Sequence, residues 1–447
     1  MKQQIKLTIA ICLAITLMLG GCLKDDVKNL KNRVSDLETQ QKDLAALVAA
    51  LESNDYITDI TAVTEAGEQV GYTITFSNSP AITLYNGSVT SINTNANGTV
   101  TLTLAGGNKV TLPFEMGDGT AANPRKIFNA EGLNAMRTNL SWHYKLIDDI
   151  TVSNWLPAGN YINGISSRMF SGSLDGQGYK ITINNFSDEI QKSSNGYYNY
   201  GLIGYTNSTS HVKNLHVQIN VQANSLKTDG IVYYGAIVGN TSGKIENCRV
   251  SGTLAFNSSA SNAAYIGGIV GSINGSSAVL TNCVSGAAID AATEGDIFAG
   301  ALAGQTAYGT LSHSYATGAV NAKGGGCHAG GLVGDVSTNS TITSCVALLE
   351  SVTGARTGTG TLNVGRVAGD FIISSKVEKN YAYNIMQVNG TPIATGTGTA
   401  TKHGANCTSA NWSLESWWTD TGTYGLGWDN TIWDFSGIST TSYPKLR

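Results

Sequence analysis

The sequence of 447 residues is poor in charge and in proline. Only 13% of the residues are charged, and 31 acidic against 27 basic side chains leave a formal net charge of -4. Phosphate binding needs concentrated lysine and arginine, so this balance argues against nucleic acid as a main partner. Six prolines and 53 glycines, set among many serines, threonines and asparagines, are typical of a long β structure with many turns.

The usual motifs of metal sites and catalytic centres are also lacking. No Cys-x-x-Cys pair occurs, and the histidines show no metal-ligand spacing, so zinc is not expected. We find no Gly-x-Ser-x-Gly motif of serine hydrolases, no phosphate-binding loop and no dinucleotide-binding motif between a strand and a helix, where each would be expected. We therefore expect no metal and no cofactor, and we assign no catalytic residue.

What the sequence does contain is a short phrase repeated six times, clearest as Gly268-Ile269-Val270-Gly271 and Gly331-Leu332-Val333-Gly334. Its closing glycines are separated by 35, 32, 33, 30 and 35 residues and stand at Gly204, Gly239, Gly271, Gly304, Gly334 and Gly369. Regular periods of this length indicate stacked repeats. Each repeat holds three short β runs separated by Gly, Ser, Asn and Thr, so we interpret one repeat as one turn of a three-sided parallel β-helix.

In such a solenoid, equivalent residues of successive turns lie about 4.8 Å apart and form ladders. The aliphatic residues inside the phrase are expected to form a buried ladder. The closing glycine is expected at a corner, with positive φ or close to the next turn. A second corner in the left-handed conformation is expected at Asn247, Asn282 and His313.

Whole-repeat spacing also predicts a ladder of small buried residues, made of Cys248, Cys283, Ser314, Cys345 and Asn380. This spacing favours free buried thiols over a disulfide framework. It gives no role to Cys327 and Cys407.

The phrase at this spacing resembles the GLUG motif of bacterial surface proteins, over roughly residues 200 to 385. The resemblance implies a secreted or surface scaffold, as in adhesins and the non-catalytic parts of large proteases, and it carries no catalytic residues. The expected fold is all-β, with a right-handed parallel β-helix, because parallel crossover connections are strongly right-handed.

The N-terminus predicts export. Lys2 and Lys6 precede an apolar run that ends in Leu19-Gly20-Gly21-Cys22, so residues 1–21 are expected to be a signal peptide, too short for a lasting membrane span. The ending resembles a lipoprotein signal, which implies lipid attachment at Cys22. The following Lys24-Asp25-Asp26 is similar to signals that send lipoproteins of Gram-negative gut commensals to the outer face of the outer membrane.

Residues 22–54 then predict a coiled-coil stalk, because the apolar positions from Val27 to Leu51 are spaced alternately by three and four. The seam favours a parallel homodimer, while Leu47 keeps a homotrimer open. Residues 56–115 alternate apolar and polar positions and predict a small β domain. Heptads followed by this domain resemble a module ahead of some polysaccharide lyases of gut commensals, although the lyase activity belongs to a neighbouring domain there.

The remaining boundaries follow from the repeats. Residues 120–200 are expected to form an N-terminal cap and the first turns, 201–405 the repeat array, and 406–447 a tryptophan-rich C-terminal cap. Five of the seven tryptophans lie in that last part. They either close the last turn or form a carbohydrate platform, since sugar faces stack on exposed indoles.

The leading hypothesis is a non-catalytic adhesin or glycan-binding lipoprotein whose partner is a polysaccharide, a host glycan or a host protein. Its sign would be a row of exposed aromatic side chains. The candidate ligand contacts are Tyr197, Tyr198, Tyr200, Tyr234, Trp417, Trp418 and Trp428. A third hypothesis is that the protein is a purely structural surface spacer, which would have neither a ligand-binding face nor a catalytic cleft.

The alternative hypothesis is a polysaccharide lyase or hydrolase on the same scaffold. It requires a cleft in which carboxylate and basic groups of adjacent turns converge. Equivalent positions one turn apart rarely both carry carboxylates, so no calcium ladder is expected. The best candidate patch consists of Asp148, Asp149, Asp175, Arg168 and Lys180.

Overall fold

The computed structural model describes residues 56–447 except 66–67, 86–88, 96–97, 105–106, 108, 161–168, 194, 222–225, 373 and 424, together with the helical residues Lys28, Lys31, Lys42, Ala45, Leu47 and Ala49. The predicted signal peptide, Cys22 and, apart from those six positions, the predicted coiled coil lie outside the described residues. No helix within the described part is long and apolar enough to cross a membrane. The chain forms two compact units, Met1–Met116 and Gly117–Arg447.

The described strands of the first unit form two small antiparallel sheets. One contains β1 (Ile57–Glu65), β2 (Glu68–Phe76) and β3 (Ile82–Tyr85), and the other β4 (Val89–Asn95), β5 (Thr99–Leu104) and β6 (Lys109–Pro113). In β5, Val100, Leu102 and Leu104 are buried while the threonines between them are half-buried, as expected for a sheet with one packed face. The predicted small β domain is confirmed.

The second unit begins with β7 (Arg125–Ile127) and the short helix α2 (Ala130–Ala135). The Asn129 side chain caps this helix, since its Oδ1 accepts from the Gly132 N–H at 2.8 Å. Two short strands follow, β8 (His143–Leu146) and β9 (Ile150–Val152). The next strand is β10 (Ser173–Asp175), whose Leu174 packs into the core.

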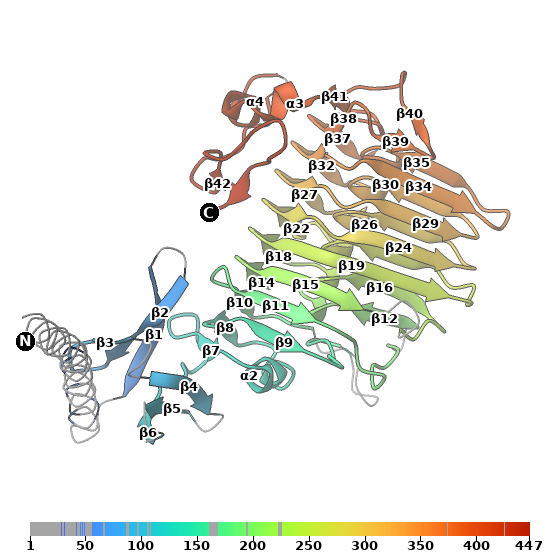
Figure 1. The fold of residues 1–447 in the computed structure, drawn as a ribbon. Helices are drawn as coiled ribbons and strands as arrows, with labels where there is room; N and C mark the ends of the chain where they lie inside the picture. Colours follow the sequence, from blue (N-terminus) through green and yellow to red (C-terminus); the bar gives the residue numbers. More distant parts are fainter. Residues whose placement is uncertain are drawn as a thin grey trace, which may run out of the picture. The chain divides into compact units, whose positions relative to one another are not determined.

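From there the chain winds as a parallel β-helix, which confirms the predicted fold class (Figure 1). We call its four sheets the tyrosine, glycine, middle and long sheets. The tyrosine sheet contains β12 (Tyr197–Tyr200), β16 (Ile231–Gly235), β20 (Ala264–Gly267), β25 (Ile297–Gly300), β30 (Cys327–Gly330) and β35 (Leu362–Gly365). The glycine sheet contains β13 (Ile203–Thr206), β17 (Val238–Thr241), β21 (Val270–Asn274), β26 (Ala303–Ala307), β31 (Val333–Val336) and β36 (Ala368–Phe371).

Two further sheets complete each turn. The middle sheet contains β7, β8, β10, β14 (His211–Lys213), β18 (Lys244–Glu246), β22 (Val279–Thr281), β27 (Thr310–Ser312), β32 (Thr341–Thr343) and β37 (Lys376–Glu378). The long sheet contains β9, β11 (Lys180–Ile183), β15 (His216–Val221), β19 (Arg249–Ser258), β23 (Val284–Ser285), β24 (Ala288–Thr293), β28 (Tyr315–Ala316), β29 (Val320–Gly324), β33 (Val346–Ala347), β34 (Ser351–Arg356), β38 (Tyr381–Tyr383), β39 (Gln387–Val388), β40 (Thr391–Pro392) and β41 (Ala405–Cys407).

The repeated phrase forms the corner between the tyrosine and glycine sheets, so a turn has four sheet positions instead of the predicted three sides. In the clearest repeat, β20 ends at Gly267 and β21 begins at Val270. A Cβ on Gly267 would lie 1.9 Å from the Val270 carbonyl oxygen, so the chain can turn this tightly only at glycine. A Cβ on the closing Gly271 would lie 2.5 Å from the Gly239 carbonyl oxygen of the preceding turn. Close approach, rather than a positive φ, explains the closing glycine.

The predicted ladders are present inside the solenoid. Ile269 and Val270 and their equivalents in the other turns are buried. The second corner has positive φ angles of 52°, 54°, 51°, 45°, 56° and 53° at Asn214, Asn247, Asn282, His313, Ser344 and Lys379, respectively. The left-handed corner predicted for three of these residues is therefore confirmed, and three further turns share it.

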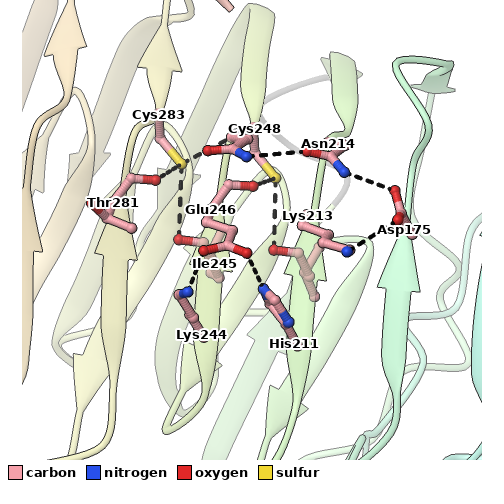
Figure 2. Close-up of polar contacts among 12 residues, drawn as sticks. Asp175, His211, Lys213, Asn214, Lys244, Ile245, Glu246, Cys248, Thr281 and Cys283 are labelled. Carbon is pink, nitrogen blue, oxygen red and sulfur yellow. Dashed lines mark hydrogen bonds and ion pairs between the residues drawn. The ribbon is translucent and has the colours of Figure 1, made fainter. Parts of the chain in front are cut away.

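The small-residue ladder follows this corner. The backbone N–H of Cys248 donates to Cys283 Sγ at 3.4 Å, and that of Cys283 donates to Ser314 Oγ at 2.9 Å. The N–H of Cys345 likewise donates to the Asn380 side chain at 3.1 Å. All five cysteines in the described residues are buried and free, as predicted for the ladder cysteines. Figure 2 shows the Cys248 and Cys283 rungs beside the polar outer face of the middle sheet.

The C-terminal residues 409–447, which we call the tryptophan segment, contain α3 (Ser409–Trp412), α4 (Glu415–Thr419), β42 (Trp433–Asp434) and β43 (Lys445–Leu446). The segment folds back along the outer face of the long sheet, where its rings form a core with Val284, Tyr315, Val346 and Tyr381 (Figure 1). These four residues occupy one register position in four successive turns. The tryptophans thus cover a side of the solenoid in addition to its last turn.

Candidate functional site

Two columns of outward residues meet at the corner made by the repeated phrase, and we call this surface the corner face. The tyrosine sheet contributes Asn199, Tyr233, Tyr265, Phe298, His328 and Asn363 in register. The glycine sheet contributes Tyr205, Asn240, Ser272, Gln305, Asp335 and Asp370. The columns contact each other, since Asn363 Nδ2 donates to Asp370 Oδ2 at 2.8 Å.

Aromatic rings stack along the first column. The Tyr233 and Tyr265 centroids are 4.9 Å apart with planes at 13°, and those of Tyr265 and Phe298 are 4.7 Å apart at 8°. The imidazole of His328 follows at 4.9 Å. Such pairs each contribute about 0.5–1.5 kcal/mol beyond their burial. Because the rings cover one another's faces, the stack presents ring edges, rather than faces, to solvent.

A pocket of about 180 Å³ lies at the N-terminal end of the corner face. It is lined by Gly159, Asn160, Ser193, Asn195, Tyr197, Asn199, Tyr205, Tyr233, Asn240 and Asn274. Asn199 and Asn240 are each only 7% exposed, and within the described residues neither amide oxygen has a hydrogen-bond partner. An unsatisfied buried acceptor costs about 1–3 kcal/mol. The pocket wall therefore contains two buried amide oxygens whose hydrogen-bonding capacity is unused within the described residues.

The other end of the corner face carries two carboxylates. Asp335 and Asp370 pair in register on the adjacent strands β31 and β36. Burial raises the pKa of Asp335 and the neighbouring Asp370 raises it further, although Gln305 Nε2 donates to the Asp335 carboxylate at 3.1 Å. His328 Nδ1 lies 3.8 Å from Asp370 Oδ2. Carboxylate and imidazole groups of adjacent turns thus converge here.

Sequence reasoning missed this carboxylate pair, although the signal was present. Each aspartate directly follows a closing glycine, Gly334 or Gly369. Alignment of the repeats on those glycines would have placed the two carboxylates at equivalent positions of adjacent turns. Most other equivalent positions do not carry two carboxylates.

Most of the aromatic residues predicted as ligand contacts are buried. The buried ones, which can offer no ring face to a ligand, are Tyr198, Tyr200, Tyr234, Trp418 and Trp428. This corrects the prediction. For the tyrosines the reason is the strand period of two, since in β12 the inward Tyr198 and Tyr200 flank the outward Asn199. Trp418 and Trp428 are instead buried in the core between the tryptophan segment and the long sheet. Trp417 is half-buried against Tyr381.

Of the predicted contacts, Tyr197 alone is among the described residues that line the pocket, where it packs edge-on against Tyr233 at 5.6 Å. The rest of the pocket, Asn199 and Asn240 above all, was not predicted. Its asparagines come from separate repeats, so their convergence depends on where each turn places its corner.

The catalytic patch considered around Asp175 is occupied by internal contacts (Figure 2). Asp175 Oδ1 accepts from Asn214 Nδ2 and from the Gln177 N–H, both at 3.0 Å, and Lys213 forms an ion pair with the carboxylate at 3.3 Å. Burial raises the pKa of Asp175, but these bonds outweigh burial and leave it lowered. Asp149 accepts from the Lys180 N–H at 2.7 Å, and Arg168 lies outside the described residues. These carboxylates therefore hold turns together.

Glu246 repeats this pattern two turns further on, at the same register position. It accepts from His211 Nε2 at 2.6 Å and pairs with Lys244 (Figure 2). Among the described residues, no group of three or more His, Cys, Asp or Glu side chains is arranged to hold a metal ion.

No family model matches the sequence, and no curated protein matches it significantly. Among solved structures, the chain is similar to one described as a "putative immunoglobulin A1 protease from Bacteroides ovatus", with 19% identity and a TM-score of 0.49. The match covers 74% of this chain and 94% of that chain. The activity in that description is that protein's, and no residue of the present chain takes a role from it.

Proposed function

We propose that the protein is a lipid-anchored surface protein whose β-helix binds a glycan at the corner face. The observation that carries the proposal is the pocket in which Asn199 and Asn240 present buried amide oxygens without partners beside tyrosine rings. The surface placement rests on the Leu19-Gly20-Gly21-Cys22 signal and on the resemblance of the repeated phrase to the GLUG motif.

The chemistry of the pocket fits a sugar. Asparagine amides both donate and accept, as sugar hydroxyls do, and tyrosine combines an apolar ring with a polar tip. The volume of about 180 Å³ lies below the roughly 300–1,000 Å³ of drug-sized ligand pockets. A single terminal sugar residue is therefore the expected occupant.

The test is calorimetric titration of the full chain, purified in detergent, with neutral oligosaccharides ending in glucose, galactose, mannose or N-acetylglucosamine. Asn240→Leu keeps the side-chain size and removes the amide. It should weaken binding about 5- to 150-fold, because one lost buried hydrogen bond costs about 1–3 kcal/mol. Asn321→Leu, on the outer face of the long sheet, is the matched control. Equal oligosaccharide affinities of the two variants would exclude this pocket as the glycan-binding site.

A second candidate function, hydrolysis of a glycosidic bond, is favoured by the in-register pair Asp335 and Asp370. Neighbouring strands lie about 4.8 Å apart, close to the roughly 5–5.5 Å between the carboxyl groups of retaining glycosidases. Asp335, whose pKa burial raises, would serve as the acid, and Asp370 as the nucleophile.

Reducing-end release from the same oligosaccharides distinguishes hydrolysis from binding. If hydrolysis occurs, Asp335→Asn and Asp370→Asn should each abolish release, whereas Asp290→Asn on the long sheet should not. If the native protein binds a glycan but releases no reducing ends, the hydrolase function is excluded and the binding function stands.

A further inference from the structure

One column of residues on the outer face of the long sheet changes its chemistry along the solenoid. Val284, Tyr315, Val346 and Tyr381 are buried under the tryptophan segment. The same register position in the three preceding turns holds Lys180, His216 and Arg249. The column therefore becomes basic where the segment ceases to cover it.

A cavity of about 840 Å³ lies at this transition, between the tryptophan segment and the solenoid. This volume is within the roughly 300–1,000 Å³ of small-molecule sites. Its walls carry the cationic side chains of Arg249, Lys445 and Arg447, the polar side chains of Gln177, Asn214, Asn247, Thr441 and Ser442, and the rings of His216, Tyr315 and Tyr443. None of the described lining residues is aspartate or glutamate.

Two of the cations in this wall, Arg249 and Arg447, donate hydrogen bonds to neutral partners. Arg249 Nη2 donates to His216 Nδ1 at 3.1 Å, while His216 Nε2 lies 2.9 Å from Ser251 Oγ, so the imidazole is neutral with its proton on Nε2. Burial, Arg249 and Lys180 lower the pKa of His216 to about 4, which keeps it neutral at neutral pH. Arg447 Nε donates to the Asn430 carbonyl at 2.9 Å.

No ion pair joins these three cations to a carboxylate among the described residues. Acids also lie near this wall, outside the lining. Hydrogen bonds from Ser436 and then the charges of Arg447 and Lys445 lower the pKa of Asp434. Asp175 accepts from Asn214 Nδ2 at 3.0 Å, and Asp149 acts to raise the pKa of His216 against the larger lowering effects. In the wall itself, the Asn247 Oδ1 is buried without a hydrogen-bond partner in the described part of the chain. The cavity thus combines positive charge that no lining side chain neutralises with amide and hydroxyl groups.

We propose that this cavity is a second ligand site that binds an anionic saccharide, with its carboxylate or sulfate group held by Arg249 and Lys445 and its hydroxyls by the amide side chains. Positive charge selects the anion, and charge-assisted hydrogen bonds are roughly twice as strong as neutral ones. The many amides and hydroxyls select a polyhydroxylated molecule over a lipid chain. This inference does not depend on the corner face.

The experiment titrates the full chain in detergent with three probes of similar length: oligogalacturonate for carboxylate, sulfated dextran oligomers for sulfate, and uncharged dextran. At least one anionic probe should bind both the native protein and the Asn240→Leu variant, whereas any binding of dextran, which ends in glucose and belongs to the corner face, should be lost in that variant. The stronger of the two anionic probes identifies the anion. Arg249→Gln should weaken binding about tenfold or more, Arg249→Lys less, and Lys445→Gln by an intermediate factor.

Lys376→Gln is the control, because Lys376 is exposed on the middle sheet and pairs with Glu378 at 2.8 Å. If Lys376→Gln weakened binding of the anionic probe as much as Arg249→Gln, the attraction would be unspecific and the proposed site would be refuted. Failure of both anionic probes to bind would refute it as well. A melting curve of each variant separates lost binding from lost folding. Asn240→Leu should leave the titrations with the two anionic probes unchanged, so the two sites fail independently.

Discussion

The Tyr315 hydroxyl donates to the Pro444 carbonyl oxygen at 2.8 Å, across 129 residues of sequence. Tyr315 is only 6% exposed, and its ring centroid lies 5.9 Å from that of Trp433 and 6.1 Å from that of Trp428. It belongs to the solenoid, while its partners belong to the tryptophan segment. This residue therefore links the side of the β-helix to the C-terminal end of the chain.

Removal of that hydroxyl tests the link. Tyr315→Phe leaves a buried carbonyl without its donor and should cost about 1–3 kcal/mol of unfolding free energy, whereas Tyr315→Ala should cost about 3–5 kcal/mol through the cavity that it creates. Urea unfolding measures both. Tyr308→Phe, at an exposed tyrosine, should be neutral. Protease should cleave the tryptophan segment faster in Tyr315→Phe than in the native protein, and fastest in Tyr315→Ala. A cleavage rate of Tyr315→Ala equal to the native rate would contradict the packing of this segment against the side of the solenoid.

Gly271→Val tests the corner between the tyrosine and glycine sheets. Its Cβ would meet the Gly239 carbonyl oxygen at 2.5 Å and the Tyr234 backbone nitrogen at 2.6 Å, and neither backbone atom can move without its whole strand. We expect a loss of more than about 4 kcal/mol, seen as low soluble yield and a lower melting temperature. Thr253→Val, exposed on β19, should change neither. A variant at Gly271 as stable as this control would refute the steric reason for the closing glycines.

The buried cysteines should resist thiol reagents in the native protein. Burial raises the pKa of Cys345 and Cys407 to about 12 and that of Cys327 to about 11, so the reactive thiolate is scarce at pH values near 8. Iodoacetamide followed by peptide mass spectrometry should label these positions only after unfolding in guanidinium. Rapid labelling of Cys345 in the folded protein would show that its rung opens.

Two histidines should make stability fall in acid. Burial and neighbouring cations lower the pKa of His216 and of His403 to about 4, against about 6.5 in an unfolded chain. Their folded pKa values are depressed, so the unfolded state binds protons first, and the stability that depends on neutral imidazoles is complete above about pH 6.5 and is lost as the pH falls towards 4.

The measurement is the change in melting temperature between neutral pH and about pH 4.5. His403→Gln should show a smaller fall than the native protein. The difference between the two proteins is decisive, because carboxylates with lowered pKa values, such as Asp175 and Glu246, also lose stabilising interactions in acid. Identical falls would exclude a contribution from His403.

The solenoid could be predicted because its ladders repeat chemistry at a fixed spacing. The closing glycines, the left-handed corner at Asn247 and Asn282, and the rung of Cys248 and Cys283 each follow from residues one period apart. Local geometry determines them, so one repeat explains the others.

The candidate sites could be predicted only in small part, since they depend on which way a side chain points and on contacts between distant segments. A shift of one residue in β12 decides whether a tyrosine or Asn199 lies on the outer side of the sheet. The contact of Tyr315 with Pro444 leaves no periodic signal, because residues 409–447 do not repeat. The tryptophan cluster therefore resembled an end cap in the sequence, whereas it also packs along four turns.

The column from Lys180 to Tyr381 limits how the number of repeats can change during evolution. Solenoids usually gain or lose whole repeats at little cost, because each repeat contacts only its neighbours. Here, a repeat inserted between Val284 and Tyr381 would leave one apolar residue of the column uncovered by the tryptophan segment. A repeat deleted from this stretch would place the charged Arg249 beneath that segment. Repeat number in this stretch is therefore coupled to the length of the tryptophan segment, and the two should change together.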